Sequence, residues 1–124
     1  MFSERIRLMS LVTKLDAAEA QLDSAIEMYF GGGNDIAIHT LAAASYDLLR
    51  DLRSAVGLED ELEALIRPER IDEFRRMWRE SQNFFKHADR DPDGVLEFNP
   101  SRTLMVLVFG AGHFQAFRAP SGHM

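Results

Sequence analysis

The chain has 124 residues, of which 46% are hydrophobic and 27% charged, and its formal net charge is −6. This length fits one domain with a hydrophobic core, and the composition excludes a disordered chain. The negative net charge argues against broad electrostatic attraction to nucleic acid or anionic lipid, although it is compatible with a local basic face. The absence of cysteine excludes disulfides, thiolate catalysis and thiolate zinc sites, and it is compatible with a reducing cytosol.

The sequence begins with an amphipathic pattern and shows no signal segment. Its longest apolar run, residues 104–109, is far shorter than the roughly 20 residues that span a bilayer. We therefore predict a cytoplasmic protein without a membrane segment. Residues 1–118 are expected to form a single domain, and residues 119–124 a flexible C-terminal tail.

The first half of the chain predicts two long helices. Apolar residues with a period of 3.6 indicate an amphipathic helix from about residue 6 to residue 29. Three glycines at 31–33 predict a turn, after which Asn34 or Asp35 caps a second helix over residues 35–56.

The second half of the chain predicts a short helix and two longer ones. The short helix is expected over residues 59–67, where Pro68 ends it and opens the next helix, residues 69–88. After a loop, a last helix is expected over residues 101–118, with glycines in its middle that favour a bend or an early end. No segment alternates with period two. The predicted fold is therefore all-α, an antiparallel bundle of four main helices plus one short helix.

The end of the predicted helix 69–88 holds the densest group of side chains that could bind a ligand or transfer a proton. Arg79, Asn83 and His87 are spaced four residues apart, so on a helix they share one face. They offer a fixed cation, an amide and an imidazole that titrates near neutral pH, a set that suits holding a phosphodiester and transferring a proton. The structural alternative is that Asn83 and His87 only complete the end of the helix and contact the acidic loop after it.

This helix is also basic, although the chain is acidic. Its segregated cations predict either an anionic partner or ion pairs with the acidic first helix. The candidate binding residues on and beside it are Lys86, Arg76, Arg90 and Gln82.

The segment Gln82-Asn83-Phe84-Phe85-Lys86-His87, late in a helix of a small all-helical domain, resembles the Arg-(polar)-x-x-x-His motif of HEPN domains. By that resemblance Asn83 matches the polar position and His87 the histidine. Gln82 stands at the arginine position, where it cannot supply a permanent charge. HEPN domains are helical bundles, often dimers, and catalytic members cut RNA at the dimer interface without a metal.

The resemblance implies a non-cleaving HEPN-like module for binding or dimerisation. We expect a homodimer that interacts with RNA, a nucleotide or a protein partner and needs no cofactor. If the domain does cleave RNA, His87 is expected to transfer the proton, Arg79 to steady the phosphate and Asn83 to orient it.

Two alternatives to this function are a purely structural protein-interaction domain and a calcium-binding bundle, the second of which rests on the loop that follows. It reproduces the first half of a calcium loop, with a glycine at the sixth position, although Pro100 replaces the glutamate expected at the twelfth. Aspartate and glycine are also the usual residues of a turn between helices. The candidate calcium ligands are Asp89, Asp91, Asp93 and Glu97.

The histidines allow one further hypothesis. His39 falls among the apolar positions of the second helix, where a histidine is usually a hydrogen-bonded packing residue. A transition-metal site from His39, His87 and His113 with carboxylates is the alternative, but these histidines lack paired spacing.

Overall fold

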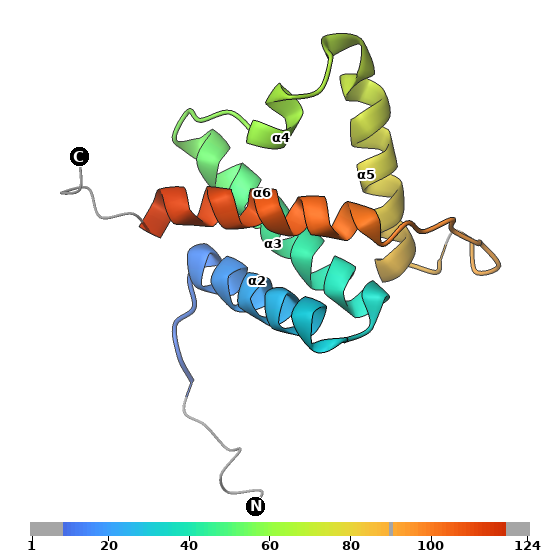
Figure 1. Ribbon diagram of the computed structural model, residues 1–124, viewed down its shortest axis with the longest axis horizontal. Coiled ribbons are helices and arrows are strands. Elements are labelled where there is room, and N and C mark those ends of the chain that lie inside the picture. The colour runs from blue at the N-terminus through green and yellow to red at the C-terminus, as the bar shows by residue number, and fades with distance from the viewer. Residues whose placement is uncertain (1–8, 90, 119–124) are drawn as a thin grey trace, which may run out of the picture.

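A computed structural model describes residues 9–89 and 91–118 of the chain. The described residues form helices and no strand, which confirms the predicted all-α bundle (Figure 1). A short helix and a 3₁₀ turn, α4 and η1, connect α3 to α5. The elements in chain order are α2 (Lys14–Gly31), α3 (Asp35–Ala55), α4 (Glu61–Ala64), η1 (Pro68–Arg70), α5 (Ile71–Lys86) and α6 (Ser101–Arg118).

The first helix begins later than its hydrophobic period predicts. Residues 9–12 are not helical, so the predicted helical start is wrong for them, and residues 6–8 lie outside the described part. The helix begins at Lys14 because Thr13 and Asp16 form a reciprocal capping box, in which each side chain accepts the other residue's backbone N–H at 3.0 Å. Leu11 and Val12, expected to face inward, are exposed as a result.

Helices α2 and α3 form an antiparallel hairpin. Gly32 ends α2 with φ +80, a left-handed conformation that glycine adopts without strain. Of the two candidate caps for α3, Asn34 is the one used: its side chain accepts the backbone N–H groups of Ile36 and Ala37 at 2.9 and 3.2 Å.

The core lies where α6 crosses this hairpin. Small side chains let α2 and α3 approach closely, and Ser45 of α3 donates a hydrogen bond of 2.7 Å to the backbone oxygen of Ala18 in α2. Helix α6 keeps its predicted bounds and continues through its two middle glycines, of which Gly110 is buried against Leu22. The buried core cluster comprises Leu22, Ala25, Ile38, Ala42, Tyr46, Leu62, Val106 and Leu107.

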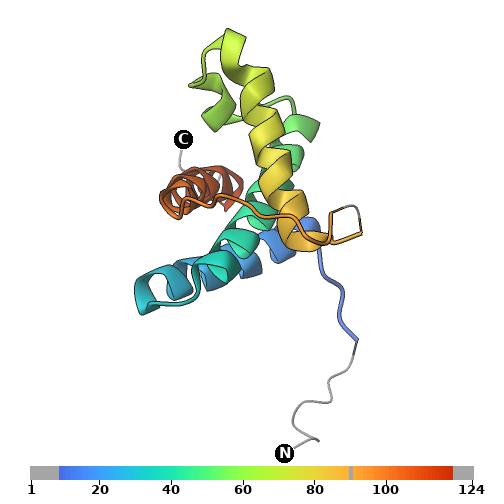
Figure 2. The same cartoon turned by 90° about the vertical axis from the view of Figure 1, so that its right-hand side faces the viewer.

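Helix α5 stands to one side of the α2–α3–α6 core and packs on α3 (Figures 1 and 2). It ends at Lys86 and not at residue 88, because His87 is extended, with φ −131 and ψ 139. The short helix is also shorter than predicted: Asp60 caps α4, and Leu58 and Leu65 at its two sides are exposed. Within the described residues, no helix combines the length and the apolar character needed to cross a membrane.

Candidate functional site

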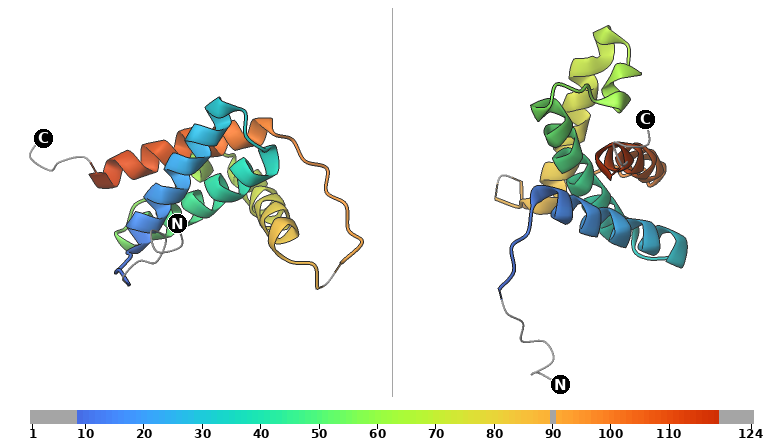
Figure 3. Two further views of the ribbon diagram at one scale, coloured as in Figure 1. Left: turned by 90° about the horizontal axis from the view of Figure 1, so that it is seen from below. Right: turned by 90° about the vertical axis from the view of Figure 1, so that its left-hand side faces the viewer.

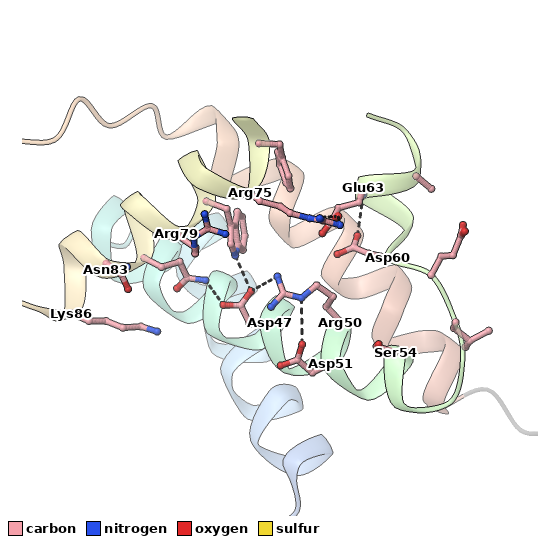
Figure 4. A pocket seen from close by; sticks show the side chains of 16 residues that line it. Asp47, Arg50, Asp51, Ser54, Asp60, Glu63, Arg75, Arg79, Asn83 and Lys86 are labelled. Atoms are coloured by element: carbon pink, nitrogen blue, oxygen red, sulfur yellow. Dashed lines mark hydrogen bonds and ion pairs between the residues drawn. The ribbon is translucent and has the colours of Figure 1, made fainter. Parts of the chain in front are cut away.

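A groove of about 750 Å³ opens between α5 and the second half of α3, with α4 at one end (Figure 4). Cationic and amide side chains of α5 line one wall, and alternating acidic and basic side chains of α3 line the floor. The groove residues labelled in Figure 4 are Asp47, Arg50, Asp51, Ser54, Asp60, Glu63, Arg75, Arg79, Asn83 and Lys86.

The carboxylate of Asp47 joins the floor of the groove to its wall. It accepts a hydrogen bond of 2.8 Å from the indole N–H of Trp78 and another from the side-chain amide of Gln82, while Arg50 lies 3.2 Å away. Burial raises the pKa of Asp47 above its usual value, and the Trp78 hydrogen bond and the Arg50 charge oppose that rise. Gln82 therefore docks α5 onto α3 through a contact that its place in the HEPN-like motif did not predict.

Asp60 closes the α4 end of the groove. Its carboxylate accepts the backbone N–H groups of Leu62 and Glu63 at 2.9 and 3.1 Å and the hydroxyl of Tyr46, and His113 Nε2 lies 3.9 Å from it. Burial by itself would raise the pKa of Asp60, but His113, Tyr46 and the Glu63 N–H together lower it to about 2. One ionised carboxylate thus connects α3, α4 and α6.

His39 occupies a buried aromatic cluster beside the groove. Its Nδ1 lies 2.9 Å from the hydroxyl of Thr103 on α6, and its ring packs edge-on against Phe85 and Phe98. This arrangement agrees with the interpretation of His39 as a hydrogen-bonded packing residue. Burial, and to a lesser degree the charge of Arg102, lower the pKa of His39.

The lowered pKa of His39 predicts a loss of stability in mild acid. In the unfolded chain a histidine titrates near pH 6.5 and so binds a proton more readily than the buried ring does. We expect the free energy of unfolding to be constant above about pH 7.5 and to fall as the pH drops through 6.5. Urea unfolding across this range should show that His39→Phe flattens the fall and that His87→Gln, at an exposed site, does not. Equal slopes in the wild type and His39→Phe would contradict the prediction.

The structure separates the three residues predicted to share a helical face. Arg79 and Asn83 line the groove, but His87 follows the end of α5 and lies in a second depression of about 570 Å³. Asn83 borders both hollows, whereas Arg79 lines only the first. The imidazole and the guanidinium therefore do not meet in one groove within a single copy of the chain.

The candidate binding residues have different positions. Lys86 lines the groove beside Asn83 (Figure 4), and Gln82 also lines it, where its side-chain amide donates to Asp47. Arg76 is exposed and lines neither hollow. Arg90 and the predicted tail over residues 119–124 lie outside the described residues.

The proposed calcium ligands Asp89, Asp91, Asp93 and Glu97 lie on the exposed connection between α5 and α6. Within residues 9–89 and 91–118, no three histidine, aspartate or glutamate side chains are grouped so that they could hold a metal ion, and this covers the three histidines as well. The turn is closed by the Gly94 N–H, which donates to the Asp91 backbone oxygen at 2.9 Å. Calcium binding stays a prediction that a titration can test.

Sequence reasoning missed the two partly buried carboxylates, Asp47 and Asp60, and their partners Tyr46, Trp78 and His113. One signal was available for Asp47, because it is a lone acid between Tyr46 and two leucines in an apolar stretch of helix. Such a residue is expected to have a buried partner. Nothing local indicates which residue that partner is.

The fold and the groove define a small helical bundle with a charged groove beside its core. No family model matches the sequence, and neither the curated proteins nor the solved structures contain a significant match.

Proposed function

We propose that the chain is a non-catalytic, HEPN-like helical binding module, and that its groove between α3 and α5 binds phosphate groups of RNA or of a nucleotide. The observation that carries this proposal is the state of the cations in the groove. Arg50 and Arg75 pair with carboxylates, the latter at 2.7 Å from Glu63. Among the described residues, Arg79 and Lys86 have no ion-pair partner and extend into the same groove (Figure 4).

The nearby acid does not neutralise these two cations. Asp47 already accepts from Trp78 and Gln82 and pairs with Arg50, and Lys86 acts on it only at a distance, where it lowers the pKa of the carboxyl. Arg79 and Lys86 therefore keep charge and hydrogen-bond donors for a ligand.

The donors on α5 suit phosphate oxygens. Arginine offers a planar fork of N–H groups and lysine a compact charge, and the Asn83 amide between them adds a neutral donor. From residue 79 to residue 86 the helix rises about 10 Å, which leaves room for more than one phosphate group. His87 lies outside this groove and Gln82 replaces the arginine of the motif, so the proposal includes binding and no cleavage.

Binding of a single-stranded RNA oligonucleotide tests the proposal. We expect Arg79→Ala and Lys86→Ala each to weaken binding by roughly tenfold or more and to reduce the slope of log K against log salt by roughly 0.7. Fluorescence anisotropy over a series of salt concentrations measures both quantities. A mononucleotide as competitor shows whether a single phosphate-bearing unit is sufficient.

Arg76→Ala is the matched control, because it removes the same charge from the same helix outside the groove. An equal loss of affinity in Arg76→Ala would show non-specific attraction and contradict a site in the groove. RNA should be recovered intact after incubation with the protein in the absence of metal ions. Cleavage that His87→Ala abolishes would instead support the ribonuclease alternative.

A further inference from the structure

The second depression, of about 570 Å³, holds aromatic, aliphatic and acidic side chains that do not line the phosphate-binding groove. Phe84 and His87 come from the end of α5, and Val95 comes from the connection between α5 and α6, which leaves that end in a wide arc (Figure 3). Sites for small molecules typically combine apolar walls with a few polar groups. The depression has this composition and is therefore a candidate site of its own.

The second depression lies next to the groove around the circumference of α5. Arg79, Asn83 and Lys86 recur at intervals of four and three residues and line the groove. Glu80 and Phe84 each follow a groove residue by one position, which turns them by about 100° around the helix. Asn83 borders both hollows. A ligand that reaches across Asn83 can therefore occupy both at once.

The two hollows differ in charge. The groove presents the cations Arg79 and Lys86. The second depression presents the carboxylates of Glu80, Asp89 and Asp91, which form no ion pair with any other residue in the described ranges 9–89 and 91–118. A nucleotide has the same division, because its phosphate is anionic and its base is an uncharged ring with N–H donors. The carboxylates also keep the phosphate out of the second depression, since like charges repel.

We propose that the second depression binds the guanine base of the nucleotide whose phosphate lies in the groove, an inference that rests on the phosphate binding proposed above. The half-buried ring of Phe84 offers a surface on which the base can stack, as aromatic side chains do for unpaired bases. Asp89 and Asp91 supply the acceptors, because an ionised carboxylate accepts hydrogen bonds and donates none.

Guanine matches these acceptors better than the other bases do. Its Watson–Crick edge carries two neighbouring donors, the ring N1–H and the 2-amino group, which can both donate to one carboxylate. Adenine and cytosine each place a ring nitrogen that accepts beside their amino group, and uracil places its N–H between two carbonyl oxygens. A carboxylate has no donor for these acceptor atoms, so they weaken the binding of the other three bases.

Titration of the isotope-labelled protein with mononucleotides in metal-free buffer, followed by NMR, tests the base preference. We expect guanosine monophosphate to bind roughly tenfold more tightly than inosine monophosphate, which lacks only the 2-amino group, and more tightly still than adenosine monophosphate. The backbone amide signals of Phe84 and Asp89 should move with guanosine monophosphate and not with ribose 5-phosphate, which has no base. Equal affinities for the three nucleotides would overturn the inference.

Replacing both proposed acceptors tests which side chains select the base. Asp89→Asn/Asp91→Asn should lower the affinity for guanosine monophosphate roughly tenfold, to that for inosine monophosphate. The matched control is Asp93→Asn/Glu97→Gln, which removes the same charge from the same connection at residues that do not line the second depression. The control should keep the preference for guanine. An equal loss of preference in both double variants would contradict a base site in the second depression.

Phe84→Leu tests the stacking surface. It keeps an apolar side chain and removes the ring, so we expect the affinities for guanosine and adenosine monophosphate both to fall roughly fivefold or more. The affinity for ribose 5-phosphate should not fall with them. Circular dichroism checks that the variant remains helical. Nucleotide affinities equal to those of the wild type would show that no base stacks on Phe84.

These measurements also separate the base site from the phosphate site. If Arg79→Ala weakens the binding of ribose 5-phosphate and of every nucleotide, but the wild type prefers no base, the base site is wrong and the phosphate site stands. If no nucleotide and no ribose 5-phosphate binds, both are wrong. Binding of the cationic amine agmatine that Asp89→Asn/Asp91→Asn abolishes, without any preference among bases, would assign the second depression to cations and overturn the inference.

Discussion

Replacing Asp60 with alanine is expected to lower the free energy of unfolding by about 3–5 kcal/mol. The carboxylate caps α4, accepts the hydroxyl of Tyr46 from α3 and faces His113 of α6. Its removal leaves the Tyr46 hydroxyl and the N–H groups of Leu62 and Glu63 without their acceptor. Urea unfolding followed by circular dichroism measures the change.

Asp51→Ala is the control for this experiment. Asp51 is an aspartate that also lines the groove, but its side chain is 74% exposed and lies 3.4 Å from Arg50. An exposed pair of this kind contributes at most about 1 kcal/mol. If Asp60→Ala were no more destabilising than Asp51→Ala, the carboxylate would not connect the three helices as the structure indicates.

The same residue predicts how stability changes in acid. The pKa of Asp60 is lowered to about 2 in the folded chain, from an ordinary value of 3.8. Its contribution is therefore fully present above about pH 4 and is lost as the pH falls through 2. The difference amounts to about 2 kcal/mol. Asp60→Asn should lose this part of the acid dependence while it keeps the shape of the side chain.

Trp78→Ala is expected to cost about 3 kcal/mol and to abolish ligand binding in the groove. Trp78 donates its indole N–H to Asp47 and packs its ring against Tyr46 and Phe74, with ring centroids 5.3 and 6.2 Å away. Helix α5, which carries Arg79 and forms one wall of the groove, packs on the bundle mainly through α3. Loss of the Trp78 side chain is therefore expected to detach α5 from α3. Denaturant unfolding and RNA anisotropy measure the two effects.

Trp78→Phe separates the ring from the hydrogen bond. It keeps an aromatic ring in a smaller side chain and removes the hydrogen bond to Asp47, so we expect a cost of about 1–2 kcal/mol and largely retained binding. If Trp78→Ala bound RNA as tightly as the wild type, either the groove would not be the binding site or α5 would not depend on this residue.

The helices could be predicted where a long hydrophobic period and a local cap agree. That holds for α3, which begins after Asn34, and for α6, which begins after Asn99, whose side chain accepts the Ser101 N–H at 3.0 Å. The predicted start of α2 was wrong because the period of apolar residues continues upstream of Thr13, whereas the capping box makes the helix begin after Thr13. The local hydrogen bonds of the capping box therefore set the start of the helix, which the apolar pattern alone did not determine.

The candidate site could be predicted in part for a similar reason. Arg79, Asn83 and Lys86 share the groove because they are neighbours on one helix, and the spacing of residues along a helix is local information. His87 was placed wrongly relative to them because α5 ends at Lys86, two residues before the predicted end of the helix. The resemblance to HEPN domains and the binding of RNA remain predictions.

By itself the sequence determined the fold class, helices α3 and α6, and the concentration of cations on α5, because hydrophobic periodicity, helix caps and the order of charges are properties of neighbouring residues. Only the tertiary structure decided that Asp47 meets Trp78 and that Asp60 meets His113, residues 31 and 53 positions apart. Those contacts depend on how α5 and α6 pack against α3. Helix packing depends on the burial of side chains from the whole chain, so the sequence of a single segment does not predict it.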